Sequence, residues 1–134
     1  MRLSKPTSRK FTYDRDPDGA WIKIRALLPG ERTDILDNVF TQEIEYRPGE
    51  DGKPGNPVFK QTTDKKKDRE KTFVARVEDW GKFFEEDGKT PMECTPENII
   101  RAMREIEGFT EATNKFFEQL DEDLAKERAE SLGN

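Results

Sequence analysis

The sequence predicts an α+β fold, with a small N-terminal antiparallel β-sheet built from hairpins and a helical C-terminal part. Near the N-terminus, apolar and polar residues alternate on both sides of an Asp-Gly turn, which is the pattern of half-buried strands. Near the C-terminus, apolar residues recur every three or four positions behind a Thr-Pro-Glu start, which is the pattern of helices. We expect a single domain over residues 1–134, with a flexible basic arm at 1–10, a β-rich part with one short helix at 11–62 and a helical part at 72–131.

Two short runs near the N-terminus, Lys10–Asp14 and Ala20–Arg25, alternate apolar and polar residues and are predicted strands. Between them lies Asp16-Pro17-Asp18-Gly19, whose Asp-Gly pair tolerates the positive φ angles of tight hairpin turns. The first element is therefore expected to be a β-hairpin.

The middle of the chain gives helix and strand signals around a long loop. Behind Pro29-Gly30, apolar residues at helical spacing predict a short helix; they are Ile35, Leu36, Val39 and Phe40. Strands are expected at Thr41–Arg47 and Pro57–Thr62. The stretch Pro48–Asn56 between them is a predicted loop, because three Gly and two Pro in nine residues disfavour regular structure.

A second helix is expected behind the mixed-charge run Lys65–Lys71. The apolar residues that would share one of its faces are Phe73, Val77, Trp80 and Phe84. The stretch Phe73–Val77 is also rich in residues that favour strands, so a strand remains open there.

Capping signals mark two C-terminal helices. Thr95 is expected to cap the first, with Pro96 at its first position and Glu97 near the positive end of its dipole. Gly108 is expected to end this helix, and Thr110 to cap the next one. The apolar residues of the two helices are Ile99, Ile100, Met103 and Ile106, then Phe116, Phe117, Leu120 and Leu124.

The composition excludes several kinds of chemistry. The chain contains no His, so Ser-His-Asp and Cys-His nucleophile pairs and His-rich metal sites are not available. Cys94 is the only Cys, which excludes an intramolecular disulfide and fits a reducing cytoplasm. We nominate no catalytic, cofactor-binding or metal-binding residue, and we expect a protein that is not an enzyme and needs no cofactor.

The expected compartment is the cytoplasm. No apolar run approaches the roughly 18 residues of a membrane span, so no membrane contact is expected. The segment Met1–Lys10 has basic residues but no apolar stretch of the kind found in secretory signals.

Two charged motifs have a functional and a structural interpretation. The stretch Asp14–Gly19 matches the opening D-x-D-x-D-G of a calcium-binding loop, but its twelfth position is Arg25 where a bidentate Glu is needed. A charged hairpin turn is the preferred interpretation. Candidate phosphate contacts are Arg2, Lys5, Arg9, Lys10 and the run Lys65–Lys71. A net charge of −5 opposes nucleic-acid binding, so a small nucleic-acid-binding regulator is kept only as an alternative.

The C-terminal helices carry more large apolar side chains than a small domain with so thin an N-terminal core needs. Part of this stripe is therefore predicted to serve a partner, and adjacent aromatic residues on a helix cannot point the same way. The predicted partner-binding residues are Ile100, Met103, Phe116, Phe117, Leu120 and Leu124. In the alternative interpretation they form core with one another and with Trp21 and Trp80.

Several stretches carry a family resemblance. They are Asp18–Glu31, which reads D-G-x-W-I-x-I-R-x-L-x-x-G-E, then Val77–Gly81, Glu86–Lys89 and Cys94–Ile99, which contains T-P-E-N. In these stretches the chain resembles the small tail-assembly proteins of long-tailed bacteriophages and prophages, above all their tail-assembly chaperones.

The resemblance implies a non-enzymatic protein that coats the long, helical tape-measure protein, keeps it soluble and helps to recruit tail-tube subunits in the host cytoplasm. In that family a ribosomal frameshift often produces a longer form of the same chain. A structural tail component is the alternative among binding proteins, and a homo-oligomer is left open.

Overall fold

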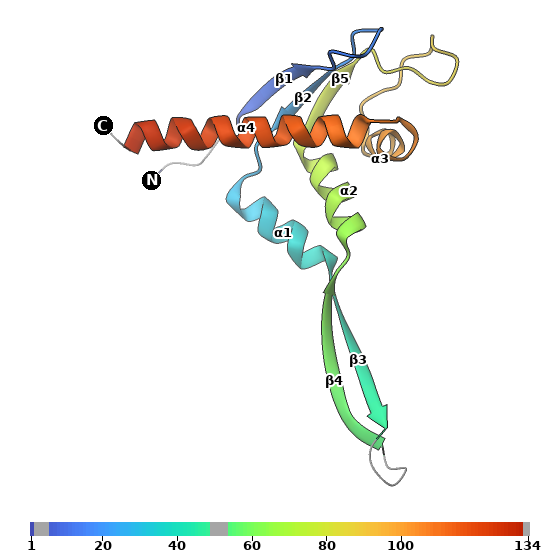
Figure 1. Ribbon diagram of the computed structural model, residues 1–134, viewed down its shortest axis with the longest axis vertical. Coiled ribbons are helices and arrows are strands. Elements are labelled where there is room, and N and C mark those ends of the chain that lie inside the picture. Colours follow the sequence, from blue (N-terminus) through green and yellow to red (C-terminus); the bar gives the residue numbers. More distant parts are fainter. Residues whose placement is uncertain (2–5, 49–53, 133–134) are drawn as a thin grey trace. The chain divides into compact units, whose positions relative to one another are not determined.

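The computed structural model describes the backbone of residues 1, 6–48 and 54–132, and the side chains of these residues except 36–63 and 132. The elements follow in the order β1 (Ser8–Thr12), β2 (Trp21–Arg25), α1 (Pro29–Val39), β3 (Phe40–Pro48), β4 (Pro54–Thr63), α2 (Lys65–Arg76), β5 (Val77–Gly81), α3 (Pro96–Glu105) and α4 (Phe109–Leu132) (Figure 1). Antiparallel sheets and helices, including the long C-terminal α4, make this an α+β protein, which confirms the predicted fold class.

The chain divides into two compact units, where the sequence predicts one domain. Residues 1–28 and 73–134 form the larger unit, which holds a sheet of strand order β1-β2-β5 together with α3 and α4. Residues 29–72 form the smaller unit, which holds α1 and the β3–β4 pair. Within the described part of the chain, no helix has both the length and the apolar character that crossing a bilayer requires.

The larger unit is built on the hairpin that the N-terminal alternation predicts. β1 and β2 pair antiparallel along their whole length. In the turn, the Asp16 carboxylate accepts a hydrogen bond from the Ala20 amide at 2.8 Å, and Gly19 has a positive φ of 73°. The sheet already includes Ser8–Lys10, so the predicted flexible arm at 1–10 is wrong for these residues, because pairing with β2 fixes them.

The strand β5 corrects the prediction of a helix in this stretch. Val77–Gly81 pairs with β2 as the third strand of the sheet. The register shifts between Lys23 and Ile24 of β2, which leaves one extra residue in β5. This bulge brings Val77 and Trp80, three positions apart, to the buried side, where each is 6% exposed. Buried residues at that spacing imitate helical periodicity, which explains the error.

In the smaller unit, α1 confirms the predicted short helix, and β3 and β4 pair antiparallel with each other. The strands predicted at 41–47 and 57–62 lie inside β3 and β4. The loop predicted at 48–56 is wrong at both ends, because Pro48 and Pro54 pair in the extended ladder; its positions 49–53 lie outside the described residues. Within this unit, Arg32 donates two hydrogen bonds to Asp68, at 2.8 and 3.2 Å.

The start of α3 follows the predicted capping chemistry. The Thr95 hydroxyl accepts a hydrogen bond from the amide three residues on, at 3.2 Å, and Pro96 is the first helical residue. Thr110 does not cap α4, which already begins at Phe109. The reason is that the carbonyl of Gly108 accepts the first hydrogen bond of this helix, at 3.0 Å.

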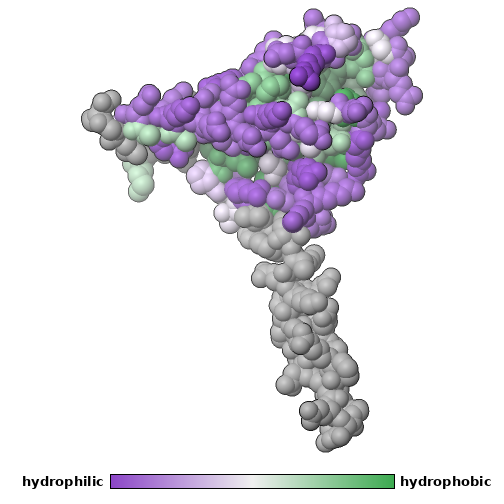
Figure 2. Space-filling view, viewed as in Figure 1, coloured by the Kyte–Doolittle hydropathy of each residue, from purple (hydrophilic) through white to green (hydrophobic). Residues whose placement is uncertain are grey.

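The core of the larger unit lies between the sheet and the helices. Its buried members are Ala20, Ile22, Ile24, Phe73, Val77, Trp80, Phe83, Met92, Ile99, Ala102, Phe109, Phe117 and Leu120. Figure 2 shows hydrophilic residues along the visible face of α4, with apolar residues appearing behind this helix. The helix therefore covers the core with one face and presents charge on the other.

Arg76 is the one strongly buried charged residue among the described residues, at 6% exposure. Its guanidinium donates two hydrogen bonds to Asp121 of α4, at 3.0 and 2.7 Å, and a third to the Arg25 carbonyl at 2.9 Å. The same group lies 4.4 Å from the centroid of the Phe117 ring. Arg76 thereby ties the end of α2 to both the sheet and α4.

Gly81→Ala is expected to destabilise the larger unit. A Cβ atom at this position would overlap the indole of Trp21, so the strand or the ring must shift. We expect a loss of about 1–3 kcal/mol in the free energy of unfolding, measured by urea denaturation. Gly30→Ala is the matched control, because a Cβ there meets nothing within 4 Å. Equal losses in the two variants would contradict this close packing.

Breaking the Arg76–Asp121 pair is expected to cost more than breaking the Arg9–Asp123 pair. Asp121→Ala leaves a buried guanidinium without two charged hydrogen bonds, so we expect a loss of about 2 kcal/mol in the free energy of unfolding. The Arg9 and Asp123 side chains are each 35% exposed, and their coupling is expected to stay under about 1 kcal/mol. Double-mutant cycles in urea, with Met replacing each Arg and Ala each Asp, measure both couplings. A larger coupling energy for Arg9–Asp123 than for Arg76–Asp121 would refute the stronger role given to the buried pair.

Candidate functional site

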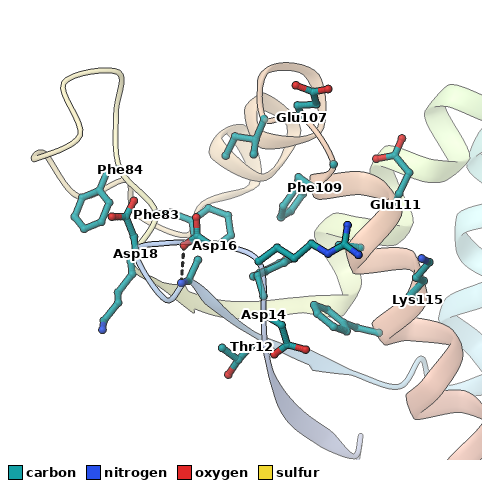
Figure 3. Close-up of a pocket in the computed structure, with 18 of the residues that line it drawn as sticks. Thr12, Asp14, Asp16, Asp18, Phe83, Phe84, Glu107, Phe109, Glu111 and Lys115 are labelled. Atoms are coloured by element: carbon teal, nitrogen blue, oxygen red, sulfur yellow. Dashed lines mark hydrogen bonds between the residues drawn. The ribbon is translucent and has the colours of Figure 1, made fainter.

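The larger unit contains an open cleft of about 820 Å³. Three segments line it: residues 12–20 from the β1–β2 turn, residues 82–88 after β5, and residues 106–116 from the corner between α3 and α4. Figure 3 shows side chains of all three segments gathered around this space. The cleft is therefore a tertiary feature that brings together residues far apart in the sequence.

Four aromatic rings form the floor of the cleft: Tyr13 and Phe116 are partly exposed, and the buried Phe83 and Phe109 pack beneath them. The ring centroid of Tyr13 lies 5.1 Å from that of Phe116, 5.8 Å from that of Phe83 and 6.3 Å from that of Phe109. Phe83 and Phe109 are themselves in edge contact, with centroids 5.8 Å apart. Three of these four contacts are edge-to-face, a favourable arrangement for aromatic pairs, so the floor is a packed surface and not a set of loose side chains.

Tyr13 also connects the hairpin to α4 through its hydroxyl. This group shares a hydrogen bond of 2.8 Å with the hydroxyl of Thr113, which is fully buried. Burial raises the pKa of Tyr13 well above its usual range, so the phenol stays protonated at any physiological pH. Tyr13 therefore acts as a fixed part of the floor and not as a proton-transfer group.

Charged side chains form the rim, six of them acidic and three basic. They are Asp14, Asp16, Asp18, Glu85, Glu107, Glu111, Arg15, Lys82 and Lys115. The Ala20 amide holds Asp16, and Arg101 donates two hydrogen bonds to Glu85, at 3.1 and 2.9 Å. Within the described residues, no hydrogen bond or ion pair engages the four remaining carboxylates, those of Asp14, Asp18, Glu107 and Glu111.

Local hydrogen bonds fix the loop that borders the cleft after β5. Asp87 accepts hydrogen bonds from the Thr90 hydroxyl and from the amides of Thr90 and Lys89, which lowers the pKa of Asp87 to about 2. The hydrogen bonds from Arg101 likewise lower the pKa of Glu85. Both carboxylates are therefore ionised at neutral pH, and Glu85 anchors the loop to α3.

The structure separates the predicted partner-binding residues into two groups. Phe117 and Leu120 are buried, at 5% and 0% exposure, so the prediction that they contact a partner is wrong for the folded unit. Ile100, Met103, Phe116 and Leu124 remain partly exposed. Of these, only Phe116 lines the cleft, where it stacks on Phe11 with centroids 4.7 Å apart.

Apart from Phe116, the residues that line the cleft were not predicted as site residues, and three of them matter most for its surface. Ile106 lines the cleft and is 38% exposed, so it offers apolar surface to a ligand. Tyr13 and Phe83 belong to the floor. The alternation that predicts the hairpin does place Tyr13 on one face of the predicted strand Lys10–Asp14, but no local pattern shows that α4 packs against this face.

The basic N-terminal residues are partly engaged within the fold. Arg9 forms an ion pair with Asp123 at 2.6 Å, and the ammonium of Lys10 lies 4.3 Å from the centroid of a Trp21 ring. Arg2 and Lys5 lie outside the described residues. Two of the predicted phosphate contacts therefore already have protein partners.

Neither the Asp14–Gly19 stretch nor Cys94 belongs to a metal-binding group in the described part of the chain. No cluster of three or more Cys, Asp or Glu residues there is arranged to hold a metal ion. Asp16 instead serves the hairpin turn, in line with the structural interpretation of the Asp14–Gly19 stretch. Burial, with a smaller effect of Asp79, raises the pKa of the half-buried Cys94 thiol to about 11.

No family model, curated protein or solved structure matches the chain. The site must therefore be interpreted from its own chemistry. An open aromatic floor with a charged rim is suited to noncovalent binding of another molecule.

Cys94 is expected to react slowly with thiol reagents. A thiol whose pKa rises from 9.0 to about 11 has roughly a hundredth of the usual thiolate at pH 7, partly offset by a more nucleophilic anion, so we expect alkylation about tenfold slower than for an exposed thiol. The rate should rise with pH up to about 11. Iodoacetamide labelling followed by mass spectrometry measures it, with the urea-unfolded chain as control. An alkylation rate that levels off near pH 8 would contradict the raised pKa of the Cys94 thiol.

Proposed function

We propose that this protein is a non-enzymatic tail-assembly chaperone of a long-tailed bacteriophage or prophage, which binds the helical tape-measure protein and assists assembly of the tail tube. The observation that carries the proposal is the open cleft with its aromatic floor. The motif resemblance of Asp18–Glu31 and Cys94–Ile99 supports the family, and the cleft supports binding as the activity.

The cleft has the composition of a protein-binding surface. Aromatic side chains are enriched at the centre of protein interfaces, where they give a large apolar contact area at low entropic cost. Ile106 adds an exposed apolar side chain, and the partly exposed Phe116 lines the same cleft. Such a surface fits the apolar stripe of a partner helix, as in other helix-in-groove complexes.

The charged exterior suits a protein that keeps another chain in solution. Charged residues make up 40% of the sequence, and the net charge is −5. The described residues of α4 beyond Leu124 are exposed, and they include Lys126, Glu127, Arg128 and Glu130. A complex that covers the partner's apolar stripe and displays such a surface would resist aggregation.

Co-expression with the neighbouring long helical protein of the same gene cluster tests the function. We expect the soluble yield of that protein to rise severalfold when this chain is present, because its apolar stripe is covered. Ile106→Ser should lower the gain at least about twofold, since it removes an exposed apolar contact at the rim of the cleft.

Ala129→Ser is the matched control, because Ala129 is an exposed residue of α4 outside the cleft. It should leave the gain unchanged. A soluble yield that does not depend on this chain would overturn the chaperone proposal, and equal effects of the two variants would place binding outside the cleft.

A further inference from the structure

We propose that the cleft takes a basic amphipathic segment of the partner, whose Lys or Arg stems lie on the aromatic floor and whose charged ends lie among the rim carboxylates. The inference rests on the proposed function, because it names the chemistry of the partner segment. It follows from three properties of the described residues: the balance of charge at the rim, the carboxylates left unpaired there, and the rings beneath them.

The first property is the charge balance. The lining residues include six acidic and three basic side chains, a net charge of −3 within a chain whose total is −5. Even with Glu85 neutralised by Arg101, five carboxylates face three cations. A ligand of the opposite sign is therefore favoured both in approach and in the bound state.

The second property is the availability of the carboxylates. Asp14 and Asp18 lie in the hairpin turn, and Glu107 and Glu111 lie at the corner that leads into α4 (Figure 3). Within the described residues these four carboxylates bind no other side chain. Because they come from two separate segments, they suit a ligand with more than one cation better than they suit a single small ion.

The third property is the floor. Aromatic faces attract cations, and the methylene stems of Lys and Arg pack on apolar surface while their ends remain solvated. The protein uses this mode twice within its own fold, with Lys10 over Trp21 at 4.3 Å and Arg76 over Phe117 at 4.4 Å. In the cleft, the partly exposed rings of Tyr13 and Phe116 offer the same combination to an external chain, with Ile106 at the edge for an apolar side chain of the partner.

Two fluorescein-labelled peptides of equal length test the inference, one an amphipathic Leu–Lys helix and the other its Leu–Glu counterpart. We expect the full chain to bind the Leu–Lys peptide at least about tenfold more tightly, measured by fluorescence anisotropy. The variant D14N/D18N/E107Q/E111Q should weaken this binding about tenfold, because it removes the free rim charges.

The variant E118Q/E122Q/E127Q/E130Q is the matched control. It changes the net charge by the same amount at exposed positions of α4 outside the cleft, so binding should stay within about twofold of the unmodified chain. Thermal unfolding of both variants establishes that each is folded. Equal weakening in both variants would show attraction by net charge alone and would overturn the inference.

No preference for the Leu–Lys peptide over the Leu–Glu peptide would also overturn it. Failure here is distinguishable from failure of the proposed function. If this chain still keeps the neighbouring protein soluble, the proposed chaperone activity stands. The segment of that protein that the chain contacts would then be apolar and uncharged.

Discussion

The cleft exists because one buried ring holds the α3–α4 corner against the sheet. Phe109, the first residue of α4, is 3% exposed. Its ring contacts the rings of Tyr13, Phe73, Trp80 and Phe83, with centroids 5.8 to 6.3 Å away. These partners belong to the hairpin turn, α2, β5 and the loop after it. This side chain therefore packs the helical corner against every other segment of the cleft, and the Tyr13–Thr113 and Arg101–Glu85 hydrogen bonds add to its hold.

This anchoring preorganises the floor of the cleft for binding. The rings of the floor pack on buried neighbours, and the Tyr13 hydroxyl is held by Thr113. Ordering flexible side chains on binding costs about 0.5–1.5 kcal/mol each, and a floor that is already packed avoids most of that cost. The four unpaired carboxylates of the rim, in contrast, stay exposed and can adjust to the ligand. The floor of the cleft thus supplies rigid apolar contacts, and the rim supplies polar contacts that can adjust.

Features encoded by neighbouring residues could be predicted from the sequence, and features made by distant residues could not. The hairpin turn at Gly19 and the cap at Thr95 depend on a few consecutive residues, so their signals are local. The strand β5 depends on a bulge in its pairing with β2, which no local pattern reveals. The cleft depends on ring contacts across the whole larger unit. Phe116 and Phe117 point to different sides of α4 as expected, yet only the packing of Phe73 on Phe117, with centroids 5.0 Å apart, decides which one is core.

The charged groups that stabilise the fold have hydrogen-bond partners within it, whereas four carboxylates at the rim of the cleft have none among the described residues. No buried side-chain N or O atom of the described residues lacks a hydrogen-bond partner, and Arg76 uses its guanidinium on a carboxylate, a carbonyl and a ring at once. A buried charge must be satisfied in this way, because leaving it unpaired costs several kcal/mol. The four free carboxylates of the rim are solvated and carry no such requirement, so the fold does not depend on their gathering around an aromatic floor, although Glu111 in the first turn of α4 also favours the positive end of that helix's dipole. Their mutual repulsion opposes it slightly, and a cationic ligand would relieve that repulsion while covering the rings beneath.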